Sequence, residues 1–570
     1  MNISRNHETL GAAALMKLAE AGGPGAALAA RRAAALWERS DPTRARRAMA
    51  LAAQLAPLAP APRLGLARLA AEAGDIEAAA ATANQVLASS AEPAARGRAA
   101  FMLGELARNA GAQADARTHY ERALAIYDAE LARERDNPDA GRWYARACGR
   151  IAELDASAQD FVRARAGAES AVGMLHAIVA HIGETPELAA DIADAELRLG
   201  ALELDSNQPS SARRRVGDAI GRYEALAITE KEEPHWRAVL SDAWALAAEA
   251  DYARGAADAA REAMDRSLQA RLGLAARDPN EAWALAGTWR VRGALRAALG
   301  DNTAAAESLQ QARAIAERLS AADRRAEAPA HFLVHTLLDQ ADQALRVGEA
   351  SVALEAATEA LRIAQTFAAQ KSASAAWFAD AAACWDRLGE VARAARASSE
   401  DAFARATEFR RMACNRSPDS ARNTRALAAS LLKQGDAALE RHDNVTARAA
   451  FSESAKLRLN LKQSAADDRA GAHALAVALE RLGLAAQAAG DVAAAREAWE
   501  EELSLAYRLF QSDDIEGMRF CAIVESHLAN AGGPDADAHR LSALERFDAL
   551  ARAGALTERE AALRKRLWRS

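Results

Sequence analysis

Four prolines recur along the chain at nearly constant spacing. Pro138, Pro186 and Pro234 are 48 residues apart, and Pro279 follows after 45. Self-similarity at such a period is typical of stacked helical hairpins. Proline is tolerated in the first turn of a helix, where its missing N–H would have no partner. Each proline therefore predicts the start of the same helix in successive units.

The repeat extends beyond the prolines as a series of small residues at one place in each unit. These anchor residues are Ala67, Gly104, Ala152, Gly200, Ala248, Gly293, Ala341, Gly389, Gly435 and Gly483. A second alanine follows nine of them by twelve positions, and only the unit of Gly389 has Asp401 there. Small residues at two fixed points let antiparallel helices approach closely. We expect ten hairpins, with turns near residues 74, 111, 158, 207, 255, 300, 348, 397, 443 and 490.

One unit carries several residues of a known repeat motif. Leu103-Gly104, Ala116 and Tyr120 match parts of the pattern W-x2-L-G-x2-Y…A-x3-F, and nine weaker copies share its phase. The chain therefore resembles the tetratricopeptide repeat (TPR) family, in a long-repeat bacterial form, because most units run near 48 residues. The resemblance implies an all-α fold: an α-solenoid of about ten antiparallel hairpins forming a right-handed superhelix with helical caps.

The length of 570 residues also favours an extended array. Single cores stop growing at roughly 250–300 residues, whereas a solenoid adds a local core with each repeat. We place the array at residues 61–511. A solenoid must cover the apolar faces of its end repeats, so residues 1–60 and 512–570 are expected to be helical caps at the N-terminus and C-terminus.

Motifs for catalysis and cofactor binding are missing. The sequence contains no G-x-x-x-x-G-K-[ST], G-x-G-x-x-G or G-x-S-x-G, so we expect no catalytic residue, no cofactor and no enzyme activity. His331 and His335 have the spacing of a two-histidine zinc site, but Phe332 stands where a zincin has its glutamate. We therefore expect no metal.

Charge and cysteine usage restrict the partners and the compartment. Residues 1–60 and 551–570 each carry about +4, which leaves about −15 for the interior. An acidic interior disfavours nucleic acid, which needs a basic track along its phosphates. The four cysteines form no CxxC pair, and the amino end has no long apolar run, which suggests a cytoplasmic protein without a membrane segment.

In a TPR array, the residue after the anchor glycine points into the concave groove. Here that position is acidic in six units: Glu105, Glu153, Glu249, Asp342, Glu390 and Asp436. Leucines share this face, namely Leu338, Leu345, Leu432 and Leu439. An unpaired carboxylate buried among leucines is costly, so the acids should be reachable by solvent, a partner or an intramolecular cation. Alternatively, the acids only solubilise alanine-rich helices or pair within their own repeats with Arg108 and Arg393.

These patterns predict a protein-interaction scaffold or adaptor. A groove of leucines and spaced carboxylates suits a basic, partly apolar segment of another protein or peptide. The main alternative is a dedicated regulatory subunit that controls one effector enzyme through its convex face or caps. A sensor that changes pitch on binding a small ligand is a further alternative, and the oligomeric state stays open.

Overall fold

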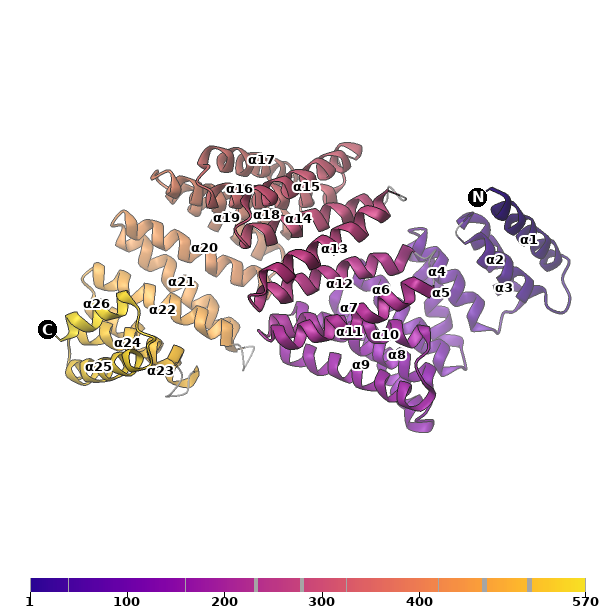
Figure 1. Cartoon of the computed structure of the whole chain (residues 1–570), viewed down its shortest axis with the longest axis horizontal. Helices are drawn as coiled ribbons and strands as arrows, with labels where there is room; N and C mark the ends of the chain where they lie inside the picture. Colours follow the sequence, from indigo (N-terminus) through magenta and orange to yellow (C-terminus); the bar gives the residue numbers. More distant parts are fainter. Residues whose placement is uncertain are drawn as a thin grey trace. The chain divides into compact units, whose positions relative to one another are not determined.

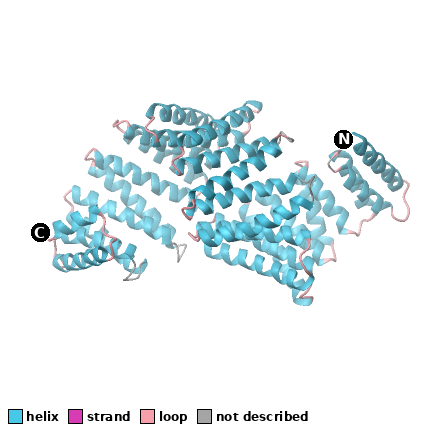
Figure 2. Cartoon of the chain, in the orientation of Figure 1, coloured by secondary structure: helices cyan, strands magenta, loops and turns pink. Residues whose placement is uncertain are grey.

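The computed structural model describes residues 2–568, apart from 39, 159, 230–233, 277–280, 324, 419, 464–468 and 510–514. These described residues form 26 helices and no strand (Figure 2), which confirms the all-α fold class. The chain divides into two compact units, Met1–Arg277 and Asp278–Ser570 (Figure 1). Pro279, expected to open a helix, lies outside the described residues. None of the described helices combines the length and apolarity that a bilayer crossing demands.

The first unit contains thirteen of the described helices. They are α1 (Asn2–Glu20), α2 (Ala26–Trp37), α3 (Pro42–Leu55), α4 (Pro60–Glu72), α5 (Ile76–Ser89), α6 (Pro93–Asn109), α7 (Gln113–Arg133), α8 (Pro138–Ser157), α9 (Phe161–Ile182), α10 (Pro186–Asp205), α11 (Pro209–Thr229), α12 (Pro234–Ala253) and α13 (Ala257–Ala275). From α4 onward they pair as five hairpins, in which even-numbered helices come first.

The second unit contains the other thirteen described helices. They are α14 (Ala282–Ala298), α15 (Asn302–Ala322), α16 (Glu327–Arg346), α17 (Ala350–Ala368), α18 (Ala375–Ala394), α19 (Glu400–Arg416), α20 (Ala421–Glu440), α21 (Asn444–Gln463), α22 (Arg469–Ala488), α23 (Val492–Leu509), α24 (Ile515–Ala531), α25 (Ala536–Arg552) and α26 (Glu558–Leu567). All ten expected turns fall between the two helices of a hairpin, which confirms the repeat phase.

Prolines and caps begin the helices as the sequence indicates. The side chains of Asn137 and Thr185 accept hydrogen bonds from the backbone N–H groups of Ala140 and Leu188, and the prolines that follow them occupy the first helical turn. Such caps satisfy N–H groups that have no partner inside the helix. The periodic prolines therefore mark the starts of α8, α10 and α12.

The anchor glycines allow the two helices of a hairpin to touch. A Cβ atom added at Gly104 would lie 2.5 Å from the ring of Tyr120, and one at Gly435 would lie 2.4 Å from Phe451. Both rings are fully buried and come from the second helix, sixteen residues after the anchor. The glycine therefore provides the space into which the aromatic ring packs.

Each hairpin also contributes to a core that it shares with its neighbours. One hydrophobic cluster joins Leu175 of α9 to Leu188 and Ile192 of α10, and includes residues of α8. The flanking helices pack in the same way, since α3 contacts α4 and α24 contacts α23. The boundaries at residues 60 and 511, the latter outside the described residues, stay a prediction.

Candidate interaction surfaces

The acids of the predicted groove form an ion-pair ladder between successive hairpins. In the first unit, Arg150 of α8 contacts Glu105 of α6 at 2.8 Å and Glu153 of its own helix at 2.9 Å. Arg198 of α10 then contacts Glu153 at 2.6 Å. Each arginine lies two residues before the next anchor. In each rung of the ladder, the acid directly follows the anchor residue of one hairpin. The base that it contacts lies two residues before the anchor residue of the next hairpin.

The second unit repeats this register. Arg387 of α18 bonds Asp342 of α16 at 2.9 Å and also pairs with Glu390 of its own helix. Glu390 accepts a 2.6 Å bond from Lys433 of α20. The ladder ends at Asp436, which lies 3.3 Å from Arg481 of α22. Five of the six predicted acids thus have an intramolecular cation, mostly from the following repeat.

The ladder acids differ in how strongly they hold their charge. Although burial opposes ionisation, Tyr120 and the arginines 108 and 150 lower the pKa of Glu105, and Lys433 and Arg387 lower that of Glu390. In contrast, burial raises the pKa of Asp342 to about 6 despite Arg387. The ion pairs therefore offset the desolvation cost completely in some rungs and only partly in others.

Glu249 is the exception among the six acids. The register puts Ala201 and Leu246 where the ladder would place an acid and a base, so the pairing stops before α12. No ion pair joins Glu249 to any described residue, although its carboxylate is accessible to solvent. Partial burial and the nearby charge of Asp205 on α10 raise its pKa, and burial also raises the pKa of Asp205. Glu249 therefore feels the charge of Asp205, and neither acid has an ion pair with a described residue.

The predicted groove leucines differ in exposure. Leu338 is only 7% exposed and belongs to the core around Trp377. Leu345, Leu432 and Leu439 are half-buried and pack beside hydrophobic clusters. Leu338 therefore serves the packing of α16, whereas the other three leucines keep part of their surface accessible.

His331 and His335 meet one carboxylate of the next repeat. His331 Nδ1 lies 2.5 Å from one oxygen of Asp380, and His335 Nε2 lies 3.3 Å from the other. His331 also stacks on the buried ring of Trp377. Arg142 and Asp191 form the same contact, at the same positions of their repeats, at 2.6 Å. His335 likewise takes the place of Arg146, which lies 2.7 Å from Asp191, so the two histidines replace two arginines. No metal-binding group was found among the described residues.

Asp380 is not evident from the histidine spacing, because it lies on α18 of the next repeat. The spacing of 49 residues between His331 and Asp380, equal to that between Arg142 and Asp191, was the available signal. The same holds for the bases of the ladder. The sequence signal for these bases is a lysine or arginine that recurs two residues before the anchor residue.

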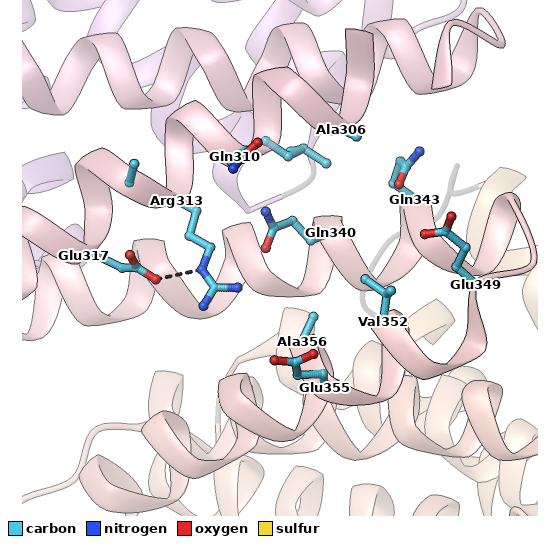
Figure 3. A pocket seen from close by; sticks show the side chains of 12 residues that line it. Ala306, Gln310, Arg313, Glu317, Gln340, Gln343, Glu349, Val352, Glu355 and Ala356 are labelled. Carbon is cyan, nitrogen blue, oxygen red and sulfur yellow. Dashed lines mark hydrogen bonds and ion pairs between the residues drawn. The ribbon is translucent and has the colours of Figure 1, made fainter. Parts of the chain in front are cut away.

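A separate cleft lies between second helices in the second unit (Figure 3). It has a volume of about 480 Å³ and is lined by α15, α16 and α17. Arg313 is engaged there by Glu317 and Glu359, each at 2.7 Å. Glu349 and Glu355 add negative charge, and the amides of Gln310 and Gln340 lie along the cleft. The charged groups of the cleft thus include an excess of acids, beside an apolar lining that contains Leu309 and Val352.

The hairpin register and the anchor packing define the class: the described residues form a helical repeat protein built of stacked antiparallel hairpins. No family model matches the chain, and no curated protein matches its sequence. Among solved structures, the apo form of RapI is 12% identical over 71% of this chain and 98% of its own, with a TM-score of 0.45. Yeast Tom70 is 14% identical over 83% and 98%, with a TM-score of 0.32.

Human IFIT1, solved as a dimer with m7Gppp-AAAA, is 14% identical over 85% of this chain and 91% of its own. Its TM-score is 0.38. Likenesses at these scores carry no argument about function. The class therefore rests on the hairpins of this chain.

Proposed function

We propose that this chain is a non-enzymatic interaction scaffold of the long-repeat bacterial TPR type, which holds a basic, partly apolar segment of another protein against its first helices. It would act in the cytoplasm without a cofactor and would bind neither nucleic acid nor membrane. The observation that carries the proposal is Glu249, the ladder acid without an ion pair to a described residue, which lies near the second acid Asp205.

A lysine or arginine of the bound segment would supply that cation. Elsewhere the same face is neutralised by the chain itself, so the charge that attracts a basic partner is concentrated at α10 and α12. Tyr252 follows Glu249 by three residues, on the same side of α12, and is 43% exposed. An aromatic ring beside two carboxylates suits a cationic side chain with an apolar stem.

The test uses an array of synthetic extended peptides that combine leucine with lysine or arginine, probed with the full chain. We expect the double variant Asp205→Asn/Glu249→Gln to bind the selected peptides about tenfold more weakly, because losing one partly desolvated, charge-assisted contact with the bound cation costs roughly 1–2 kcal/mol. Unchanged affinity would contradict the proposal.

The matched control changes two exposed acids of second helices in the same unit, Glu121→Gln and Glu169→Gln. Both pair only with an arginine of their own helix. The control should bind like the unmodified chain. An equal loss in both double variants would indicate non-specific attraction between an acidic protein and basic peptides.

The cleft of Figure 3 favours a second candidate, a regulatory subunit with one dedicated partner. Such a partner would engage α15 and α17 instead of the first helices. Replacing Gln310 and Glu355 by alanine and arginine would then abolish co-purification of the partner from the native organism, whereas Asp205→Asn/Glu249→Gln would leave it unchanged. The two candidates predict opposite results for the two variants.

A further inference from the structure

A second cleft in the first unit has the opposite charge. It has a volume of about 560 Å³ and lies where the start of α11 meets the end of α12 and the start of α13. Its polar lining consists of Ser210, Arg213, Arg214, Asp251 and Arg254. All of these residues belong to one compact unit. We propose that this cleft binds a phosphoryl group.

The cations of the cleft outnumber its single carboxylate. Asp251 is only 3% exposed and accepts a 2.9 Å bond from Arg213 and a 3.2 Å bond from Arg254. Arg214 is exposed and has no ion pair with a described residue. Three guanidinium groups against one carboxylate leave a local charge of about +2, which a dianionic phosphoryl group would balance.

Packing between the repeats does not require the excess of arginines over carboxylates in this cleft. At the same position of an earlier repeat, the buried Asp155 is paired by Arg117 of the preceding hairpin. Arg213 makes the same contact with Asp251. Arg214 and Arg254 are additional, and the earlier repeat has Thr118 and Ala158 in their places. A single arginine therefore suffices to pair the buried acid in the earlier repeat. Here Arg254 adds a second contact to Asp251, and Arg214 has no ion pair with a described residue.

The geometry leaves donors and space for an anion. A Cβ atom at Gly217 would lie 3.1 Å from Nη1 of Arg213, so the glycine gives room for the guanidinium at the wall of the cleft. Asp251 engages Nε of Arg213, which leaves the forked end of this side chain to bind oxygen atoms. Ser210 lies in the first turn of α11, where backbone N–H groups have no partner inside the helix.

Guanidinium groups recognise phosphoryl oxygens in pairs, and several donors around one anion give short, strong bonds. The phosphoryl group can arrive as free phosphate or on a phosphorylated side chain of a protein. Both sources share the same chemistry. The site is distinct from the acidic pair at Asp205 and Glu249 and does not depend on the binding proposed there.

The experiment titrates the full chain with three probes at constant ionic strength, measured by calorimetry and by thermal unfolding. The probes are inorganic phosphate, a phosphoserine peptide and the same peptide with serine. We expect phosphate to raise the melting temperature more than chloride does, because a ligand that binds only the folded state stabilises it. Tighter binding of the phosphopeptide than of phosphate identifies a protein as the source, and equal binding identifies the free anion.

Arg214→Gln should weaken phosphoryl binding about tenfold, because it removes a charged donor that supports no packing contact. Arg254→Gln should do the same. The matched control is Arg163→Gln, an exposed arginine in the first turn of α9 that pairs with Asp160 of that turn. Equal affinity in Arg214→Gln and the unmodified chain, or an equal loss in the control, would overturn the proposal.

Discussion

One position in the hairpin turns adopts a left-handed backbone regardless of its side chain. Glycine occupies it in six turns, for example Gly348 with φ of +82°. In three others the residue is Asn207, Arg396 or His442, with φ between +55° and +64°. Asparagine tolerates this region, but for arginine the close approach of Cβ to the carbonyl oxygen costs about 1–2 kcal/mol. These turns follow the fold of the repeat against local preference.

Arg396→Gly should therefore stabilise the second unit by about 0.5–1 kcal/mol, since the strain removed exceeds the added chain entropy of glycine. The side chain of Arg396 is exposed and makes no ion pair with a described residue, so little else is lost. A shift of the urea midpoint to higher concentration would show this. The reverse change, Gly348→Ala, should lower the midpoint, and a midpoint unaffected by either change would disprove the strain argument.

At the scale of elements, the ladder makes the contact between neighbouring hairpins depend on pH. The pKa of Asp342 is raised to about 6 in the folded chain from 3.8, so between about pH 4 and 6 the folded state holds more protons than the unfolded state. Its contribution to stability is fully present below pH 4 and is lost as the pH rises through 6.

Comparison with Asp342→Asn isolates this group. The free energy of unfolding of the unmodified chain, minus that of the variant, should increase as the pH falls from 7.5 to 4.5, as measured by urea unfolding. The control is Glu408→Gln, an exposed acid that pairs only with Arg405 of its own helix. A difference that stays constant with pH, or decreases at low pH, would mean that Arg387 keeps Asp342 ionised.

The sequence predicted the elements well because their signals are local and repeated. Prolines, anchor residues and turn glycines each act within one hairpin. Although each hairpin matches the repeat motif only weakly, the ten copies agree in their spacing. The site was predicted only in part, because a partner from the next repeat lies about 45 residues away. The six acids were found, and so was the pairing of Arg108 with Glu105 at 3.0 Å inside one repeat. The bases from the next repeat were not found, and Leu338 is a core residue.

At the scale of the whole molecule, the two compact units and their chains of local cores indicate distributed stability. Trp499 is fully buried and stacks on His527. Trp499→Ala should cost about 3–5 kcal/mol through the cavity it creates. Hydrogen exchange should rise first in α22, α23 and α24 and stay unchanged in α4 to α13. A uniform rise across both units would show a single cooperative structure instead.

The register of the ladder also bears on how such a gene can change in length. Because Glu105 and Glu153 are equivalent, and Arg150 and Arg198 likewise, loss of the 48 residues from 105 to 152 would bring Gly104 directly before Glu153 and preserve an acid that meets Arg198. Duplication of the same stretch would add one matched rung. Unequal recombination could thus shorten or lengthen the array here without leaving a stranded charge. A duplication of the stretch that contains Ala201 and Leu246 would instead copy the position at which the ladder has no ion pair.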